Sequence, residues 1–581
     1  MLKFIQRLGI NEHIVLSVIA IAIGLMVGYG AILFRLLIEG FQFLFMASGN
    51  ENVAEIVRGL SWWHVLFMPV LGGAIIGPLV HFFFPSSRGD GVPEVMSAVA
   101  LRGGKLGLRE GLGKMLSCSL SIGCGGSVGR EGPVVHLGAT LASWFGSLLP
   151  MSNNHMRTIV GCGAAAGIAA SFNAPIAGVM FALEVILADY GLATFSPIVL
   201  SSVVATVIAR MHLGDFPAFI VPNYTLVSAW EIPAYVGLGL VCGLTGILFM
   251  VTLFKMEDLF ATIKIPIYLK PIIGGFCLGV IALVFPETMG VGYDIMNHAL
   301  LEEMAVLAMI ALIFAKIIAT SIALGSGFSG GVFTPSLFLG AMVGGSFGTI
   351  AHSIFPAISA GPGAYTLVGM GAMAAAVLGA PIASILILFE LTGDYRIMLA
   401  LMVASIVATL LINQIYRESV YTKTLKRKKI DLRQGREANL LRNIPVSSII
   451  RKDFETIQES MNIRQFKDKI RESQQDCFIV VAADGHLKGI ISFQDIRKVA
   501  FAEGEFDDLA LIKDFYIPNP ATIHPNENLY DALLRFEANN VEQLPVVAPD
   551  DPTLVIGLIS IHNMIRAYNM ALLSQNNPYR D

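Results

Sequence analysis

Three glycine-rich stretches carry the residue types that could do chemistry in this chain. They read GREGP at 129–133, GVFTP at 331–335 and GDGVPE at 89–94. In each stretch the glycines allow close approach of the backbone to a ligand, and the proline suits the first turn of a following helix. The free N–H groups and the positive end of the helix dipole then face the ligand. This arrangement is typical of an anion site.

Arg130 and Glu131 stand side by side within strongly apolar sequence. An ionisable residue at membrane depth is costly and therefore indicates function. For Glu131 the alternative is a carboxylate that caps a helix. Close packing of helices through small residues explains the Gly and Ala runs at 161–178. It does not explain three Gly-x-x-x-Pro starts with a glutamate in one of them, so we favour the anion site.

The composition places these stretches in a membrane. The chain has 581 residues, of which 55% are hydrophobic and 14% charged, whereas soluble domains carry about 25% charged residues. A membrane-spanning helix needs roughly 20 apolar residues, so we predict a multi-pass protein in a lipid bilayer. The apolar stretches are Ile14–Leu37, His64–Phe84, Pro197–Met211, Ala234–Phe254, Pro271–Phe285, Met304–Leu324 and Ile397–Ile412.

Two sets of internal repeats organise the chain. In the apolar part, 129–139 parallels 331–341, and 160–184 parallels 368–390 in the same order. Duplicated halves are common in transporters, as either parallel or inverted repeats. The amino-acid sequence does not distinguish parallel from inverted repeats, and we predict inverted ones. Near the carboxyl end, 489–498 parallels 557–566, and each copy follows a β-like run, which indicates two tandem α/β modules.

The composition changes after Tyr421, where KTLKRKKIDLRQGRE is dense in Lys and Arg. By the positive-inside rule this flank and the tail after it are cytoplasmic. It is also suited to anionic lipid head groups. We predict a transmembrane pore at 1–425, a basic linker at 426–443, and two α/β modules at 444–505 and 506–581.

These motifs resemble the CLC family of chloride channels and proton–chloride exchangers. GDGVPE is similar to the family's first signature, GREGP matches its second and GVFTP its third. The segment ESVYTKTL resembles the one that carries the pore tyrosine, here Tyr421, and the tail resembles a pair of CBS domains. The resemblance implies an all-α membrane fold with broken helices, a homodimer with a pore in each subunit, and a cytoplasmic tandem CBS module.

The resemblance also implies roles for particular residues. Glu131 is the gate, whose carboxylate takes the place of an outer anion until it is protonated or displaced. The amides of Val332 and Phe333 and the Tyr421 hydroxyl form the central anion site. Residues implied near the anions or behind the pore are Gly129, Arg130, Gly132, Lys114 and Glu184. The alternative for Lys114 is a lysine that reaches the membrane surface.

The sequence departs from the family pattern at two positions. Asp90 stands where the family usually has serine, and a carboxylate there repels chloride unless it is protonated or turned away. We favour Asp90 as a helix cap over a direct anion ligand. Val185 follows Glu184 where exchangers have a second, proton-relaying glutamate, and valine cannot carry a proton. The substitution favours a channel over the proton-coupled antiporter.

In the tail, the resemblance implies adenine-nucleotide binding in a cleft, with Ser492 and Asp495 holding the ribose. The second copy has Ser560 and Asn563 instead, so at most one site is expected, and simple dimerisation of the module is the alternative. No metal, required cofactor, enzymatic activity or nucleic-acid partner is predicted. The sequence contains no HExxH motif, and no cluster of His and Cys stands out in its apolar part. A CBS-regulated cation channel is a distant alternative. The short loops suit a prokaryotic inner membrane.

Overall fold

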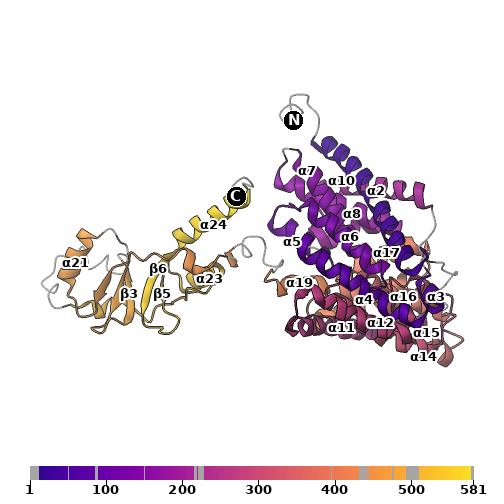
Figure 1. The fold of residues 1–581 in the computed structure, drawn as a ribbon. Helices are drawn as coiled ribbons and strands as arrows, with labels where there is room; N and C mark the ends of the chain where they lie inside the picture. The colour runs from indigo at the N-terminus through magenta and orange to yellow at the C-terminus, as the bar shows by residue number, and fades with distance from the viewer. Residues whose placement is uncertain are drawn as a thin grey trace. The chain divides into compact units, whose positions relative to one another are not determined.

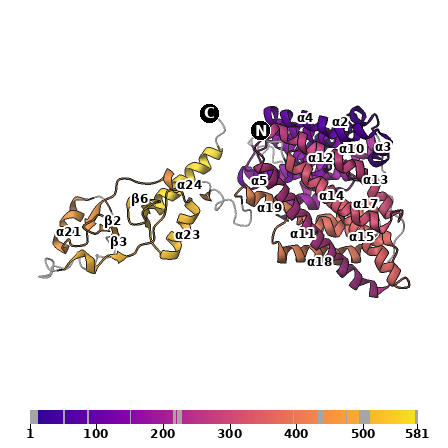
Figure 2. The ribbon, with the colours of Figure 1, turned by 60° about the horizontal axis from the view of Figure 1, so that its bottom comes forward.

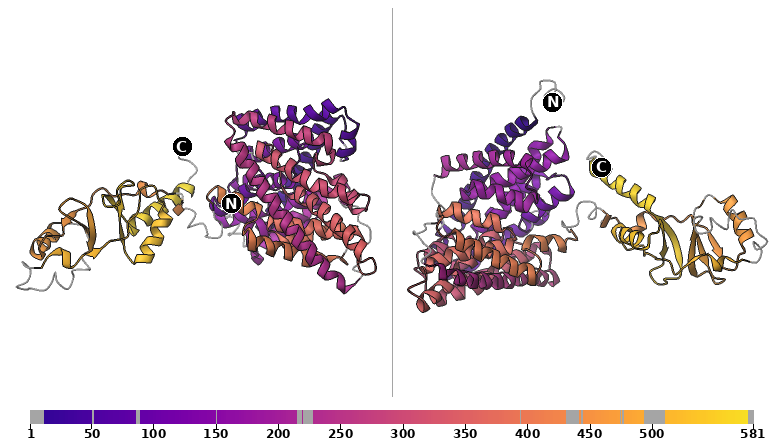
Figure 3. Two further views of the ribbon diagram at one scale, coloured as in Figure 1. Left: turned by 90° about the horizontal axis from the view of Figure 1, so that it is seen from below. Right: turned by 180° about the vertical axis from the view of Figure 1, so that it is seen from behind.

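The computed structural model divides the chain into two units, residues 1–430 and 431–581 (Figure 1). The first unit is helical, and the second contains the strands (Figure 3). The structure describes residues 12–49, 52–85, 89–149, 151–214, 219, 228–393, 395–430, 441–442, 444–473, 475, 477–492 and 510–576.

The first half of the helical unit combines long helices with short ones. Several of the short helices begin at the glycine-rich stretches, where glycine and proline interrupt the apolar sequence. The elements are α2 (Glu12–Met46), α3 (Val53–Gly59), α4 (Trp62–Pro78) with η1 (Leu79–Phe83), α5 (Val92–Leu101), α6 (Leu108–Gly123), α7 (Glu131–Ser147), α8 (Asn153–Phe172), α9 (Pro175–Phe181) with η3 (Ala182–Leu187), and α10 (Leu192–Leu213).

The second half repeats this order. Helix α12 packs against α4, and α11 packs against α18 (Figure 2). The elements are η4 (Ala229–Glu231), α11 (Ile232–Thr262), η5 (Ile267–Leu269), α12 (Lys270–Val284), η6 (Pro286–Thr288), α13 (Tyr293–Leu300), α14 (Val306–Ser326), α15 (Phe333–Ile354), α16 (Pro362–Leu378), α17 (Pro381–Thr392), α18 (Met398–Ile415) and α19 (Val420–Arg427).

Eight helices among the described residues are long and apolar enough to cross a membrane. Seven of them contain or largely overlap the stretches predicted from sequence, and the eighth is Phe333–Ile354. Large apolar side chains remain exposed on the long helices, for example Leu33, Leu248 and Leu410. Exposed aliphatic faces of this kind suit contact with lipid, and helices satisfy their own backbone groups there. The prediction of a multi-pass helical fold is confirmed.

The two halves meet through reciprocal contacts. The Gly129 N–H donates to the Gly331 carbonyl at 2.8 Å, and the Gly331 N–H donates back to the Gly129 carbonyl at 2.7 Å. This antiparallel bridge joins the starts of α7 and α15. Exchange of equivalent contacts is what a two-fold relation between duplicated halves produces, and it supports the inverted repeat.

The second unit contains two similar hairpins. The elements are η8 (Val446–Ser448), β1 (Thr456–Gln458), α21 (Ile463–Glu472), β2 (Cys477–Val481), β3 (Leu487–Ser492), η9 (Ile512–Asp514), β4 (Ile517–Pro518), α23 (Leu529–Asn539), β5 (Gln543–Val547), β6 (Val555–Ser560) and α24 (Ile561–Asn576). Strands β2 and β3 are antiparallel, as are β5 and β6, and each pair has one register shift at its end. The prediction of a tandem α/β tail is confirmed.

The two hydrophobic cores of this unit exchange segments. Strand β4 pairs with β3, and Ile512 belongs to the core that contains Phe478. In the other direction, Leu441 and Val446 belong to the core that contains Leu544. Each core therefore includes residues from the other side of the predicted boundary at 505/506. Ile512 and β4, which follow the boundary, pack on the first hairpin, whereas Leu441 and Val446, which precede the first module's strands, pack on the second hairpin.

Candidate functional site

The three glycine-rich helix starts meet at the crossing of Gly129 and Gly331. Helix α7 begins with Glu131 and α15 begins with Phe333, each two positions after its bridged glycine. Asp90 precedes α5 and reaches the same place, since it bonds to Val332. Residues far apart in sequence that were predicted to share one site are thus brought together.

Glu131 is buried, with 1% of its surface exposed. Its Oε1 atom accepts a hydrogen bond from the Tyr293 hydroxyl at 3.2 Å. Its Oε2 atom has no hydrogen-bond partner among the residues that the structure describes. Arg130 occupies the N-cap of α7, and no side-chain cap bond is formed there. In this conformation a phenol holds the Glu131 carboxylate, and no cap bond to the N–H groups of α7 is described.

Cationic side chains surround this carboxylate and its tyrosine. The Arg130 guanidinium lies over the Tyr293 ring, 5.1 Å from its centroid. A small hollow is lined by Arg130 and Tyr293 together with Arg35 and Glu39 of α2. The Arg35 side chain also forms an ion pair with Glu39 at 3.0 Å. Arg130, which was implied to lie near the anions, thus lies beside the tyrosine that holds Glu131. Tyr293 and Arg35 were not predicted.

We expect Tyr293→Phe to raise anion flux by at least about tenfold. The substitution removes the hydroxyl that holds Glu131, and a hydrogen bond to a charged group contributes about 1.5–3 kcal/mol. Flux from liposomes measures the effect. Tyr365→Phe is the matched control, because it removes a buried hydroxyl that bonds to Ser359. Equal flux in wild type and Tyr293→Phe would show that the phenol does not restrain the gate.

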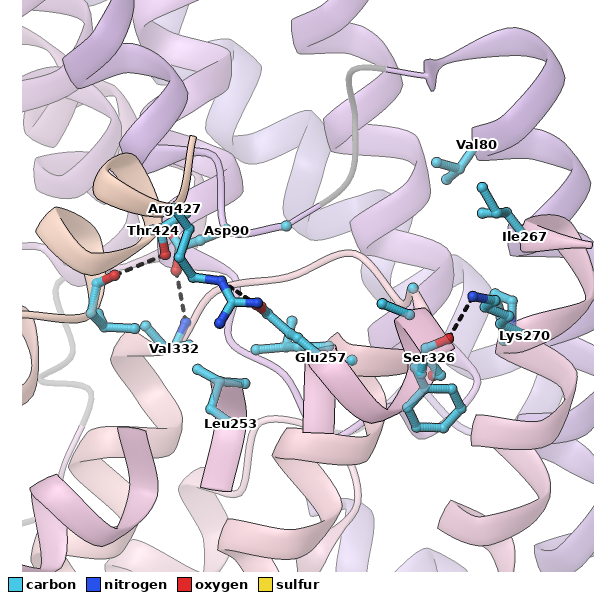
Figure 4. Close-up of a pocket in the computed structure, with 18 of the residues that line it drawn as sticks. Val80, Asp90, Leu253, Glu257, Ile267, Lys270, Ser326, Val332, Thr424 and Arg427 are labelled. Atoms are coloured by element: carbon cyan, nitrogen blue, oxygen red, sulfur yellow. Dashed lines mark hydrogen bonds and ion pairs between the residues drawn. The ribbon is translucent and has the colours of Figure 1, made fainter. Parts of the chain in front are cut away.

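A cavity of about 540 Å³ lies next to the crossing, since Asp90 and Val332 line it. Asp90, Val332 and Tyr421 lie at its wall, and Thr424, Arg427 and Glu257 also line it (Figure 4). Tyr421 lies in the first turn of α19, held by a capping box between Ser419 and Thr422. The predicted central-site residues Val332 and Tyr421 therefore line the same cavity.

Asp90 bridges two helix starts. Its Oδ1 atom accepts the Val92 N–H at 3.2 Å, and its Oδ2 atom accepts the Val332 N–H at 2.9 Å. The N-cap position of α5 is Gly91 rather than Asp90. Asp90 thus does bond to the start of its own helix, as the cap interpretation expected. It also occupies one of the amides predicted to bind the central anion.

Gly132 is needed beside this carboxylate. A side chain at Gly132 would place its Cβ atom 2.3 Å from Asp90 Oδ1 and 2.5 Å from the Asp90 carbonyl oxygen. Only glycine leaves room for such an approach. The predicted pore residue Gly132 therefore fits closely against Asp90.

Lys114 is fully buried on α6, so the alternative of a lysine at the membrane surface is wrong. Its ammonium donates to the Gly89 carbonyl at 3.0 Å and so anchors the loop that carries Asp90. Lys316 on α14 is also fully buried and donates to the Thr288 and Gly290 carbonyls at 3.0 and 3.2 Å. It anchors the loop that carries Tyr293. The repeat could have revealed Lys316, which precedes Gly331 by the same distance as Lys114 precedes Gly129.

Glu184 stabilises a helix of the other half. Its carboxylate accepts the Ile382 and Ala383 N–H groups at the start of α17, at 3.2 and 2.7 Å. Glu390 does the same for Ile176 and Ala177 at the start of α9, at 2.9 and 2.7 Å. A carboxylate at a helix N-terminus satisfies free N–H groups and the dipole. The adjacent Val185 is buried, and its side chain adds no titratable group.

We expect Glu184→Gln and Glu390→Gln to lower thermal stability by similar amounts, about 1–3 kcal/mol each. Each glutamine keeps one acceptor oxygen but loses the charge and the second bond. Melting of the purified protein measures this, with Glu303→Gln as control because Glu303 is exposed. A strong change in the pH profile of flux in Glu184→Gln, with unchanged stability, would argue for a proton-carrying role instead.

The candidate nucleotide site is described only in part. Ser492 ends β3, whereas Asp495 lies outside the described residues. In the second copy the Asn563 N–H donates to the Ser560 hydroxyl oxygen at 3.2 Å, so Ser560 is engaged with its own helix. The nucleotide interpretation stays a prediction.

The sequence model of the family described as voltage gated chloride channel matches residues 72–413, which is more than half of the chain. The chain belongs to this family. The CBS domain model matches residues 446–502 and 512–569, so this CLC protein carries a tandem CBS tail.

Known CLC proteins resemble this chain over most of its length. A putative chloride channel protein ClcB-like of Ralstonia nicotianae is 36% identical over 417 residues, covering 71% of this chain and 97% of the relative. The structure of a slow cyanobacterial Cl⁻/H⁺ antiporter matches with a TM-score of 0.64 at 25% identity, over 71% of this chain and 97% of that chain. The structure of a eukaryotic CLC transporter matches with a TM-score of 0.61 at 20% identity, over 94% and 97%. The CLC relatives thus include a protein named as a channel and one named as an antiporter.

Proposed function

We propose that this CLC protein is a gated chloride channel that conducts through a pore in each subunit. The observation that carries the proposal is the buried Glu131 carboxylate at the start of α7, beside the crossing of two helix starts. Helix N-termini attract an anion but bind it less tightly than a full positive charge would. Conduction requires binding of this moderate strength.

In this proposal the Glu131 carboxylate closes the pathway by standing in the place of an anion. Protonation or displacement of the carboxylate opens the pathway between the hollow beside Arg130 and the cavity beside Tyr421. Gly129, Gly132 and Arg130 border the outer position, and the amides of Val332 and Phe333 with the Tyr421 hydroxyl form the central one. Tyr293 restrains the gate through its bond to Glu131.

Passive conduction is favoured over proton-coupled exchange because of Val185. The side chain is buried and apolar where a relay would need a proton carrier. Its neighbour Glu184 is already bonded to two amides of α17. The antiporter named among the relatives keeps exchange as the second candidate.

The proposal includes a setting for the pore. The protein is a homodimer in a prokaryotic inner membrane, and its CBS tail is cytoplasmic, consistent with the basic flank at 423–437. The tail regulates the pore and takes an adenine nucleotide at Ser492 and Asp495.

Chloride efflux from liposomes tests the function. Purified full-length protein is reconstituted with potassium chloride inside, and efflux is started with a potassium ionophore alone. The proposal expects chloride efflux without any protonophore. No efflux in wild type and in Glu131→Gln would contradict anion conduction, and efflux that depends on a protonophore would favour the exchanger.

A further inference from the structure

Asp90 holds a position that an anion would otherwise take. Its Oδ2 atom accepts the Val332 N–H at 2.9 Å, at the start of α15 and in the wall of the cavity beside Tyr421. Figure 4 shows the Asp90 carboxylate and the Val332 amide joined by this bond at the edge of that space. An amide that is bonded to a carboxylate cannot at the same time bind a chloride ion.

The arrangement repeats the closure at the outer gate. On one side, a loop anchored by Lys316 carries Tyr293 to Glu131 at the start of α7. On the other side, a loop anchored by Lys114 carries Asp90 to Val332 at the start of α15. In each case one half of the repeat supplies a polar side chain that bonds at the helix start of the other half: Tyr293 bonds the Glu131 side chain, and Asp90 bonds the Val332 amide. The pathway thus holds two carboxylates, one at each of the helix starts that the Gly129–Gly331 bridge joins. The tyrosine that holds Glu131 lines one hollow, and Asp90 lines another.

The charged and titratable groups around Asp90 come from every element packed on it. Glu94 lies on α5 itself and pairs with Lys428 at 2.6 Å. Lys114 lies on α6 and interacts with both Asp90 and Glu94. Tyr421 on α19 lines the same cavity as Asp90, and the Cβ of His136 on α7 lies 3.0 Å from the Cβ position of Gly91. Lys114 offsets part of the negative charge, but its ammonium is directed to the Gly89 carbonyl.

We propose that Asp90 is a second, inner carboxylate gate: its ionised side chain occupies the central anion position on the Val332 amide, and anions pass when it is protonated or displaced. The proposal rests on the proposed function, since it names a regulation of the same pathway. It assigns the two gates to different sides of the membrane. Acid on the cavity side acts on Asp90, and acid on the other side acts on Glu131.

The proposal makes chloride binding weak in wild type at neutral pH. The carboxylate both occupies the amide and repels the anion, since like charges a few ångströms apart interact strongly even at a protein surface. Removing the charge is therefore expected to strengthen chloride binding by at least about tenfold. A carboxylate that only fixed the start of α5 would leave the affinity unchanged when replaced by another capping residue.

The test uses full-length protein in the Glu131→Gln background, where the outer gate is neutral. Chloride binding is measured by calorimetry at pH 7.5 and 5.5 for Asp90 and for Asp90→Ser, which keeps a capping oxygen. Asp90→Asn keeps the size and tests the charge alone if the serine variant does not fold. Glu94→Gln is the control, because it neutralises a carboxylate on the same helix and cavity without a bond to Val332.

The expected result has two parts. With Asp90 intact, chloride affinity rises when the pH falls from 7.5 to 5.5. Asp90→Ser or Asp90→Asn binds chloride at least tenfold more tightly at pH 7.5 and shows little further rise at pH 5.5. Glu94→Gln keeps the rise. In planar bilayers the same variants lose the response of current to acid on the cavity side.

Equal chloride affinity in all variants at both pH values would overturn the inner gate. If the Glu131→Gln background conducts chloride but Asp90 variants do not differ, the inner gate fails alone. If that background conducts no chloride, the proposed function fails.

Discussion

Glu131→Gln is expected to raise chloride efflux at neutral pH by about tenfold to a hundredfold. The amide copies the size of the protonated carboxyl but cannot stand in for an anion beside the helix starts. Its bond to Tyr293 changes from a charge-assisted to a neutral one, and the difference between such bonds is about 1–2 kcal/mol. The remaining gain comes from removing a negative charge that the entering chloride must displace. Efflux from liposomes over a range of external pH measures both the level and the acid response.

The control for this variant is Glu55→Gln, which neutralises an exposed carboxylate on α3. It is expected to leave efflux near the wild-type value and to keep the acid response. Glu131→Gln should instead give high efflux and lose the rise that protonation of Glu131 causes, so that only acid acting on Asp90 still raises efflux. Unchanged efflux with an unchanged acid response in Glu131→Gln would remove Glu131 as the gate.

Gly138→Ala is expected to destabilise the helical unit by about 1–3 kcal/mol or more. A Cβ atom at Gly138 would lie 2.2 Å from the Gly163 carbonyl oxygen, and one at Gly163 would lie 2.2 Å from the Gly138 carbonyl oxygen. Since both obstacles are backbone atoms, α7 and α8 must move apart. The second half repeats the contact between Gly340 and Gly369 at 2.3 and 2.4 Å, so Gly340→Ala is expected to have a similar effect.

Gly40→Ala is the matched control, because no atom lies within 4 Å of the Cβ position on α2. Alanine there is expected to be neutral or to add about 0.5–1 kcal/mol, because glycine within a helix loses more backbone freedom on folding. Thermal unfolding in detergent, followed by size-exclusion chromatography, measures all three variants. A Gly138→Ala protein as stable as Gly40→Ala would show that the α7–α8 contact is looser than the structure describes.

Local sequence was sufficient to predict the starts of the pore helices. Glycine and proline act within a few residues, so GREGP and GVFTP indicated the starts of α7 and α15 directly. The span Phe333–Ile354 was not among the predicted apolar stretches, because glycine and serine at its packed face make it the least hydropathic of the eight. Packing against α16 uses these small residues, and hydropathy alone does not register them.

The contacts within the site could not be read from the sequence in the same way. Tyr293 is 162 positions from Glu131, and Asp90 is 242 positions from Val332. These pairs meet only because the inverted halves cross at Gly129 and Gly331. An aspartate at position 90 did indicate an unusual central site. Its bond to Val332 in the other half of the repeat could not be predicted without the three-dimensional structure. Lys316 could have been predicted from the sequence repeat, because it precedes Gly331 by the same number of residues as Lys114 precedes Gly129.

The most direct test of a passive anion pathway is the reversal potential of the current in a planar bilayer. Under a tenfold chloride gradient, a passive chloride pathway reverses near the chloride value of about 59 mV. Its reversal potential also does not shift when a pH gradient is imposed at constant chloride. A reversal potential that lies well below the chloride value and moves with the pH gradient would show obligatory proton coupling, and it would contradict the channel.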